Sequence, residues 1–335
     1  MANITPAFTD TTSSDATQSL FNTLLLRRGV PMLIHQVGVK LYPLARRSGK
    51  SMIWRRFEEL AVATTPLSEG INPAGKAKTK TDVAGTIQPY GDFIEDSDMV
   101  LSTQPDPHAV ENVELLGEQM GRTFDQLYRN QWFTATNITY ANGTSLVTVS
   151  QIIDRNDLDR AYRALMVRNA LKFTPMIMAS SDIGTHPVMP AYWGMCHEDL
   201  AFDIRHVDGF VLTSEYPSHG GVLEGEFGAD KNGVRFLSSS QGYVTAGASG
   251  TTIAGTDVKN TGGFVDVYSL FIVGRDFGGG VNLAGDNGRV ITKELGSAGS
   301  ADPLDMRATV GWKKYDTRAI LNQSFLQQVY ACASL

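Results

Sequence analysis

Cysteine is scarce in this sequence, and long apolar runs are missing. The chain of 335 residues holds two cysteines, Cys196 and Cys332. Two cysteines cannot form a disulfide framework, and this favours a reducing compartment. No apolar run approaches the length that crosses a bilayer, and the polar N-terminus has no secretory signal pattern. We therefore expect a soluble protein that is made inside the cell, with no membrane partner.

The common motifs of enzyme active sites are missing as well. The sequence has no GxGxxG, GxSxG or HExxH pattern. Gly49, Lys50 and Ser51 lack the upstream glycine and the leading strand of a phosphate-binding loop. No nucleophile and base stand out among the six histidines. The sequence therefore predicts that the protein is not an enzyme and needs no cofactor.

One cluster of side chains has the chemistry of a metal site. Its members are residue types that bind zinc, but their spacing matches no standard site. They are His186, Cys196, His197, Glu198 and His206. The favoured interpretation is that Cys196 is a small buried apolar residue and that the histidines are ordinary. A metal-dependent hydrolase that uses this cluster stays open as the alternative function.

Charge is unevenly distributed along the chain. The net charge of −6 gives no general attraction to nucleic acid. Residues 27–81 hold eleven Lys or Arg and three Glu, a net charge of +8, so the rest of the chain has a net charge of −14. These two parts are expected to attract each other, within a subunit or between subunits. Binding of nucleic acid by the basic segment stays open as another alternative.

A long amphipathic helix is predicted over residues 107–132. Asp106 suits the N-cap, and Pro107 suits the first helical position. Gly117 and Gly121 lower helix stability, which predicts that another element packs closely there. Apolar residues at steps of three and four predict one buried stripe: Val110, Val113, Leu116, Met120, Phe124 and Leu127. Four acidic residues are expected to face away from it: Glu111, Glu114, Glu118 and Asp125.

An exposed hairpin is predicted ahead of this helix. Residues 51–63 have the β-branched and aromatic content of a strand. In the loop and strand over residues 64–92, Lys76, Lys78 and Lys80 alternate with small or polar residues, a strand pattern with nothing to bury. A long exposed hairpin is an aggregation hazard in a monomer. Either the lysine row keeps the hairpin soluble, or a neighbouring subunit covers it.

The remaining segments predict an α+β fold. Asn142 and Gly143 between alternating apolar positions predict a second hairpin. Residues 155–172 have the spacing of an amphipathic helix, and residues 262–278 contain a buried-strand run. Residues 229–263 are rich in Gly, Ser, Thr and Ala, which predicts a surface insertion. One dominant helix and several antiparallel strands make up the predicted fold.

Four stretches in order resemble one protein family. Residues 67–98, LSEGINPAGKAKTKTDVAGTIQPYGDFIEDSD, are similar to its hairpin segment, and the helix that follows matches in place and length. Residues 264–277, FVDVYSLFIVGRDF, and residues 302–322, DPLDMRATVGWKKYDTRAILN, are similar to two later segments. Over roughly residues 20–332 the chain thus resembles the major capsid proteins of tailed bacteriophages typified by coliphage N-four. That family resembles in turn the Hong Kong 97 (HK97) capsid fold.

The resemblance implies an HK97-like division of the chain. Its parts would be an N-terminal arm at residues 1–50, an extended hairpin loop (E-loop) at 51–105, a peripheral domain at 106–185 built on the spine helix 107–132, an axial domain at 186–290 that contains the insertion 229–263, and a return to the peripheral domain at 291–335. The insertion has no counterpart in the family pattern from residue 238 onward.

The resemblance also implies a role, partners and positions. Copies would form hexamers and pentamers that close into an icosahedral shell around double-stranded DNA, assembled in the bacterial host cytoplasm. A portal protein at one vertex, scaffolding and decoration proteins, and DNA bound without sequence preference would be its partners. Positions between subunits would be Glu69, Gly70, Lys76, Lys78, Lys80, Tyr90 and Gly91. Structural positions in the spine helix and closing strand would be Pro107, Phe124, Asp302, Pro303, Leu304, Gly311, Trp312 and Lys313.

Overall fold

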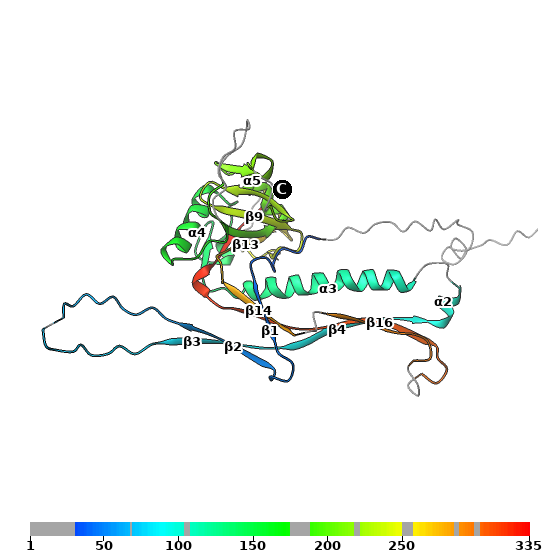
Figure 1. Ribbon diagram of the computed structural model, residues 1–335. Helices are drawn as coiled ribbons and strands as arrows, with labels where there is room; N and C mark the ends of the chain where they lie inside the picture. The colour runs from blue at the N-terminus through cyan, green and yellow to red at the C-terminus, as the bar shows by residue number, and fades with distance from the viewer. Residues whose placement is uncertain are drawn as a thin grey trace, which may run out of the picture.

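The computed structural model has three parts (Figure 1). It describes residues 31–67, 69–103, 108–174, 188–217, 222–249, 257–284, 288–297 and 302–335. The long layer consists of the helix α3 and a five-stranded sheet. The compact body, an eight-stranded sheet with the helices α4 and α5, lies above one end of that layer. The projecting hairpin, strands β2 and β3 with the loop between them, extends beyond the same end.

Strand β16 (Arg307–Ile320) organises the long layer. One of its edges pairs with β4 (Gln88–Ser97) in antiparallel register. Its other edge pairs first with β15 (Arg289–Lys293) and then with β14 (Gly278–Leu283). Strand β1 (Lys40–Leu44) continues the sheet, parallel to β14, and the short helix α2 (Asp98–Thr103) follows β4.

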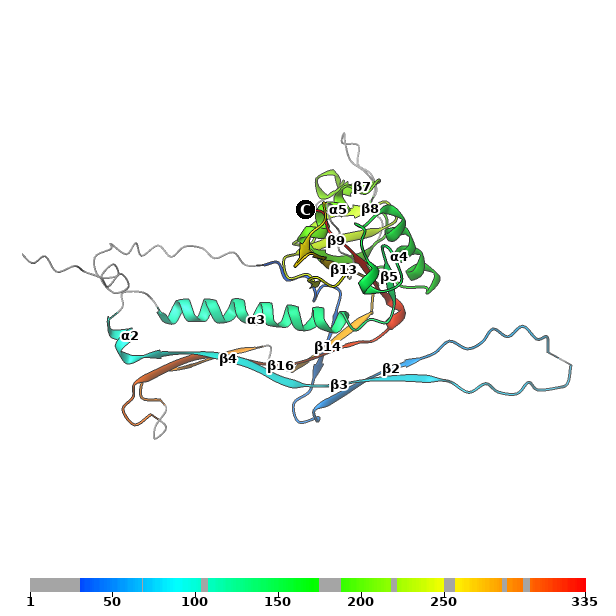
Figure 2. The same ribbon diagram turned by 180° about the vertical axis from the view of Figure 1, so that it is seen from behind.

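Helix α3 (His108–Trp132) lies along one face of this sheet (Figure 2). Leu116 and Phe124 of the helix are buried against Trp312 of β16. The apolar stripe predicted from the sequence is therefore confirmed at its centre. It is wrong at its start, where Val110 and Val113 are 61% and 37% exposed. The expected N-cap residues Asp106 and Pro107 lie outside the described residues.

The compact body is built on a mixed sheet. Helices α4 (Arg155–Val167) and α5 (Glu198–Arg205) pack on one face of it through buried aliphatic side chains. The other face meets Ile34 and Trp132, the last residue of α3, so one core joins the body to the long layer. The strand order is β5 (Ile138–Tyr140), β17 (Leu326–Ala331), β13 (Val267–Val273), β6 (Tyr192–His197), β9 (Val234–Ser239), β8 (Glu226–Asp230) and β7 (Phe210–Leu212), with β10 (Val244–Thr245) beside β13.

Several short elements complete the fold. A small two-stranded sheet pairs β11 (Asn260–Thr261) with β12 (Phe264–Val265). Among the described residues, 3-10 turns are formed by η1 (Leu146–Thr148), η2 (Thr213–Glu215) and η4 (Gln323–Phe325). Within the part of the chain that the structure describes, no helix combines the length and apolarity of a membrane span.

The predicted second hairpin around Gly143 is wrong. Gly143 does turn the chain, with a φ of +75°. However, β5 before it pairs in parallel with β17, and the 3-10 turn η1 follows it instead of a strand. The local turn signal was real, but the strand partner comes from a segment almost 190 residues away in the chain, as the pair Thr139 and Val329 illustrates.

The surface insertion predicted over residues 229–263 is also wrong in its first part. Strands β8 and β9 are almost entirely buried and pair with each other inside the larger sheet. Small residues are needed there because neighbouring backbone lies close: a Cβ on Gly233, between the two strands, would lie 2.4 Å from the Pro190 carbonyl oxygen. The abundance of glycine thus reflects close packing at this position.

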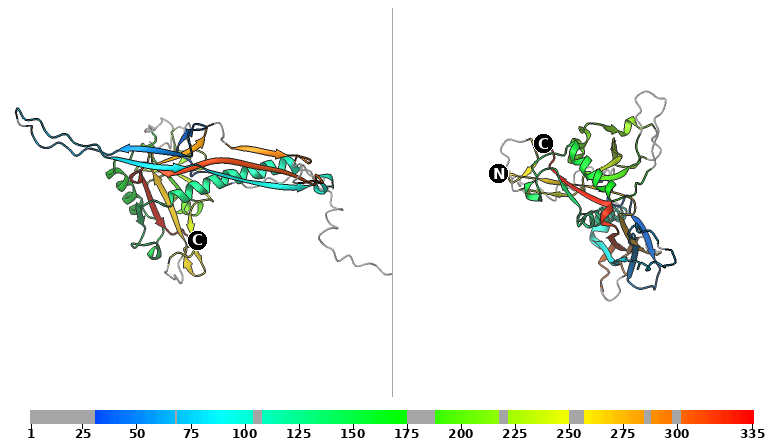
Figure 3. Two further views of the ribbon diagram at one scale, coloured as in Figure 1. Left: turned by 90° about the horizontal axis from the view of Figure 1, so that it is seen from below. Right: turned by 90° about the vertical axis from the view of Figure 1, so that its left-hand side faces the viewer.

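The expected division into peripheral and axial domains stays a prediction, but two of its segments contribute to both the long layer and the compact body. Strand β5 and helix α4, expected in a peripheral domain at residues 106–185, lie in the compact body (Figure 3). Strand β17, expected in the return segment 291–335, lies there too, between β5 and β13. The reason is backbone pairing: β17 bonds to both strands and carries the chain back from the long layer.

Candidate intersubunit surface

The projecting hairpin is formed by β2 (Ser51–Phe57) and β3 (Lys80–Thr86). The register runs from the pair Ser51 and Thr86 to the pair Phe57 and Lys80. Arg55 donates two hydrogen bonds across it to the Asp82 carboxylate, at 2.8 and 3.1 Å. Both side chains are exposed, so this ion pair fixes register and adds little stability. One more backbone hydrogen bond, from Glu58 N to the Thr79 carbonyl oxygen at 2.9 Å, joins the two arms, and beyond it they separate (Figure 1).

Large apolar side chains along this hairpin are exposed. A chain that folds alone gains free energy by removing such groups from water, at about 25 cal/mol per Å². Here they stay at the surface, spread over both arms and the loop. They are Ile53, Phe57, Leu60, Val62, Leu67 and Ile71, with exposed fractions between 57% and 83%. Exposed apolar surface on this scale is typical of a protein interaction site.

The three predicted hairpin lysines lie on the arm that leads into β3. The strand expected from Lys76 onward begins only at Lys80, because the arms separate beyond the single backbone hydrogen bond between Glu58 and Thr79. Lys76 Nζ donates to the carbonyl oxygen of Ala61 at 3.1 Å, and Lys80 lies 3.9 Å from Asp82. All three are exposed. The row therefore presents positive charge along one arm.

Glu69 and Gly70 lie in a turn of the hairpin loop, and both are exposed. Gly70 has a φ of +79°, a left-handed conformation that glycine adopts without strain. A Cβ on Gly70 would meet nothing within 4 Å. The glycine is thus needed for the backbone conformation, and the space around it is open.

Tyr90 and Gly91, which the resemblance places between subunits, lie outside the projecting hairpin. They belong to β4 and pair with Lys314 and Lys313 of β16 in the same subunit. A Cβ on Gly91 would lie 2.6 Å from the Trp312 carbonyl oxygen, so close strand packing requires glycine here. The hairpin ends before these residues because β4 has a partner strand in its own chain, whereas β2 and β3 pair only with each other.

The spine positions Phe124, Trp312 and Tyr90 form one aromatic cluster. The Phe124 ring centroid lies 5.9 Å from that of Trp312 and 5.8 Å from that of Tyr90, both edge-on. Trp312 Nε1 donates to Gln119 on α3 at 3.0 Å, and Gln119 donates to Asp92 on β4 at 2.6 Å. One glutamine thus links the helix to two adjacent strands.

The predicted closing strand begins later than expected. Asp302, Pro303 and Leu304 precede β16, which starts at Arg307. Asp302 is buried and accepts a hydrogen bond from the Arg307 backbone at 2.9 Å, whereas Leu304 is 77% exposed. These residues form the turn that starts the strand. Gly311 and Lys313 are in the strand, paired with Phe93 and Gly91 of β4.

The centre of β16 carries buried charge under α3. Burial raises the pKa of Asp316, which accepts hydrogen bonds from Tyr128 and Arg318. Burial also lowers the pKa of Lys314, whose Nζ lies 4.2 Å from the centre of the Phe124 ring. These groups hold helix and sheet together.

The alternative metal site gains no support from the described residues. Cys196 is 1% exposed, and burial raises the pKa of its thiol, so the favoured interpretation of a small buried residue is confirmed. His197 caps the start of α5, and His206 caps its end. Among the residues that the structure describes, no group of three ligand side chains is arranged to hold a metal ion. His186 lies outside those residues.

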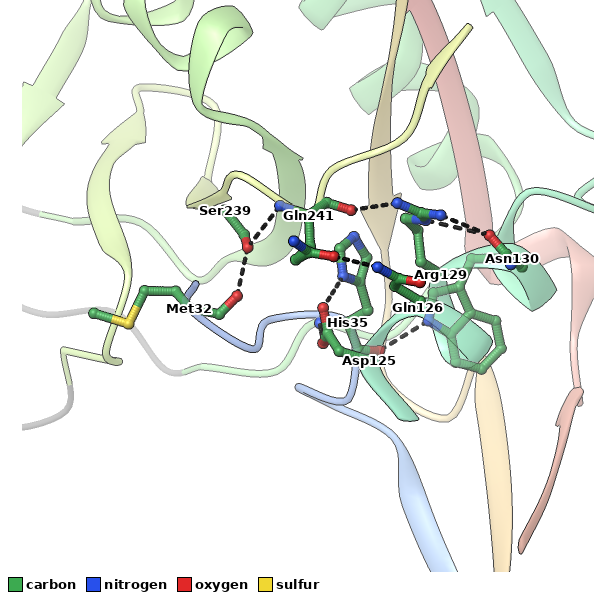
Figure 4. A network of polar contacts seen from close by, with 9 residues as sticks. Met32, His35, Asp125, Gln126, Arg129, Asn130, Ser239 and Gln241 are labelled. Atoms are coloured by element: carbon green, nitrogen blue, oxygen red, sulfur yellow. Dashed lines mark hydrogen bonds and ion pairs between the residues drawn. The ribbon is translucent and has the colours of Figure 1, made fainter. Parts of the chain in front are cut away.

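A buried polar network joins α3 to the start of the described chain (Figure 4). The sequence analysis did not predict this network. Asp125, expected at the surface, is fully buried and accepts from the backbone N and Nδ1 of His35 at 2.8 and 2.7 Å. Trp132 Nε1 donates to the carbonyl oxygen of His35 at 2.9 Å. Asp125 shares a helix face with Tyr128 and Trp132, and that second aromatic stripe was the available signal.

The same network reaches the compact body. Ser239 Oγ donates to the carbonyl oxygen of Met32, and Arg129 of α3 donates to the carbonyl oxygen of Gln241 at 2.7 Å. The segment from Met32 to His35 is therefore held by the body on one side and by α3 on the other (Figure 4). It fixes where the N-terminal chain enters the fold.

Several solved structures of phage capsids share this architecture. The capsid of Ralstonia phage GP4 matches with a TM-score of 0.64 and 11% identity over 100% of this chain and 99% of that one. The cyanophage Pam1 capsid matches with a TM-score of 0.61 and 11% identity over 97% and 99%. The capsid of cyanophage P-SCSP1u matches with a TM-score of 0.59 and 14% identity over 99% and 100%.

This chain has the fold of phage capsid proteins. The likeness extends over the full length of both chains, so it is not confined to one part. The predicted α+β class is confirmed. A scan of family models and a search of curated proteins find no match, so the narrower resemblance to the coliphage N-four type stays a prediction.

Proposed function

We propose that this chain is a major capsid protein that assembles with copies of itself into the shell of a bacteriophage. The observation that carries the proposal is the projecting hairpin, which exposes apolar side chains and basic charge in a chain with a capsid fold. In a shell, a neighbouring subunit would cover this surface. Stability would then come from many copies of one modest contact, and the role would be structural and not catalytic.

The HK97-like parts follow from this proposal. The projecting hairpin would be the E-loop, the long layer the peripheral domain, and the compact body the axial domain at the centre of a hexamer or pentamer. Packaged DNA, a portal protein at one vertex, and scaffolding and decoration proteins would be the further partners in the virion. A hairpin that docks on a different patch of its neighbour makes a heterologous contact, and such contacts close into rings.

The first test is the mass of the purified protein in solution, with electron microscopy of large species. We expect rings of five or six subunits, or closed shells. A chain that stays monomeric at all concentrations, alone and with the other virion proteins of the same phage, would contradict the proposal.

A second test asks whether the lysine row of the hairpin docks on an acidic neighbour. We expect reversal of Lys76, Lys78 and Lys80 to Glu to lower assembly strongly at low salt, because attraction between subunits becomes repulsion. The matched control reverses three exposed basic residues of the compact body, Arg163, Lys231 and Arg275, for the same change in charge. Equal assembly of both variants by light scattering would show that the basic row has no docking role.

A further inference from the structure

A second apolar surface lies at the end of the long layer opposite the projecting hairpin (Figure 1). A groove of about 820 Å³ is formed there by the start of α3, the start of β16 and the residues after β15. Val110 and Val113 of α3 and Leu295 are 61%, 37% and 42% exposed in it. The sheet continues under this part of α3, because the ends of β4 and β15 also line the groove, but the apolar stripe of the helix is exposed here. The groove therefore offers an apolar surface that the described residues leave open.

The segments that flank the groove cannot fill it. Residues 104–107 are Gln-Pro-Asp-Pro, and residues 298–301 are Ala-Gly-Ser-Ala. Neither contains a large aliphatic or aromatic side chain. The chain's own projecting hairpin starts from the opposite end of the molecule (Figure 2).

The N-terminal chain has the right composition. Residues 20–26 read Leu-Phe-Asn-Thr-Leu-Leu-Leu, five large apolar side chains within seven residues. Arg27 and Arg28 follow directly. Glu114 of α3 lines the groove. Glu118 lies about one turn further along the helix, toward Gly121, where Leu33 contacts it. The charges of the two segments are therefore complementary.

The N-terminal chain also starts from the right place. Leu33 contacts α3 at Gly121, where its Cδ1 lies 2.9 Å from the position of a Cβ. Val113 is eight residues earlier in the helix, about 12 Å away along its axis. Leu24 is nine residues before Leu33, and an extended chain of that length spans up to about 30 Å. Residues 20–26 can thus reach the groove of their own subunit without strain.

We propose that residues 20–26 of the same chain dock in this groove, with Arg27 and Arg28 beside the acidic residues of α3. The arm then completes the apolar covering of the spine helix. It removes from the single subunit a surface that would otherwise compete with the hairpin for neighbouring copies. The docking is a property of one chain and does not depend on the proposed shell, so it can be tested on dilute, unassembled protein.

The test is disulfide trapping in the full-length protein. The native cysteines are 1% and 0% exposed and have no disulfide, so they do not compete. A variant with Leu24→Cys and Val113→Cys should form an intrachain disulfide on mild oxidation, read as a faster band on non-reducing gels. A disulfide needs Cα atoms within roughly 7 Å, so the bond reports real proximity. A second variant with Leu20→Cys in place of Leu24→Cys tests whether the segment docks at a position shifted by four residues.

The matched control combines Leu24→Cys with Phe93→Cys, which is 62% exposed on the sheet face turned away from α3. The yield of the disulfide between Leu24→Cys and Val113→Cys should exceed the yield of the control disulfide several-fold. Arg27→Glu with Arg28→Glu should lower the Val113→Cys yield, because both charge contacts become repulsive.

Three results would overturn the proposal. One is equal trapping at Val113→Cys and Phe93→Cys. Another is a disulfide-linked dimer from a mixture of chains that carry Leu24→Cys alone and Val113→Cys alone, which would assign the groove to the arm of another copy. The third is a dimer between Ile71→Cys and Val113→Cys chains, which would assign it to a neighbour's hairpin.

Discussion

Large apolar residues are buried in the compact body and exposed in the projecting hairpin. In the body, every residue of β13 is buried, and its neighbouring strands and helices belong to the same chain. In the hairpin, Phe57 and Ile53 point into solvent, and β2 and β3 pair only with each other. Folding of the chain thus buries the apolar surface of the body. In the hairpin, apolar surface stays exposed to solvent, and such a hairpin is an aggregation hazard in a monomer.

The largest expected difference between the two regions comes from one substitution made in both. Phe271→Ala removes a fully buried ring from β13 and should lower the free energy of unfolding by about 3–5 kcal/mol. Phe57→Ala removes a ring that is 63% exposed and should change it by less than about 0.5 kcal/mol. Urea titration of both variants measures the free energies. Assembly should fall for Phe57→Ala, and a stability loss like that of Phe271→Ala would show that the hairpin is packed in its own subunit.

Glycine gives a comparison of intermediate size. Gly91→Ala brings a Cβ to 2.6 Å from the Trp312 carbonyl oxygen, and backbone cannot yield cheaply, so we expect a loss of about 1–3 kcal/mol. Gly75→Ala in the hairpin loop meets nothing within 4 Å and should leave the midpoint of thermal unfolding unchanged. If Gly91→Ala unfolds at the wild-type temperature, the tight pairing of β4 and β16 is disproved.

The smallest effect concerns pH. Burial raises the pKa of Asp316 above its usual 3.8, so the folded state holds this proton more tightly than the unfolded state. The free energy of unfolding therefore falls through this group as pH rises from about 3.8 to the raised pKa. Asp316→Asn should remove that fall, and its stability relative to wild type should grow with pH.

A carboxylate in the hairpin, Asp82, should contribute the opposite pH dependence to the free energy of unfolding. The hydrogen bond from Arg55 lowers the pKa of Asp82, so its contribution is present above 3.8 and lost as pH falls through the lowered pKa. Asp82 is exposed, and solvent screens it, so Asp82→Asn should change the pH profile only slightly. Urea titrations between pH 3 and 7 measure both variants. If the free energy of unfolding instead rises with pH through the titration of Asp316, the interactions of Asp316 with its charged and hydrogen-bonding partners outweigh its burial.

The sequence predicted much of the long layer because its signals are local. The helical spacing of Leu116 and Phe124 reports which face of α3 is buried, whatever lies against it. The exposed lysine row and the Gly70 turn are local signals as well. The error at Asp125 shows the limit, since a carboxylate was assigned to solvent on its charge alone. Its burial depends on His35, 90 residues earlier in the chain.

What the sequence alone determined about this protein is therefore the content of its elements: an α+β chain, a long spine helix, a polar hairpin and a resemblance to phage capsid proteins. Tertiary structure alone decided which elements are neighbours. It put β17 between β5 and β13, buried β8 and β9 inside the larger sheet, paired Tyr90 and Gly91 with β16 of the same chain, and left Val110 and Val113 exposed. Periodicity reports that a face is apolar, but only the path of the distant chain determines what covers it.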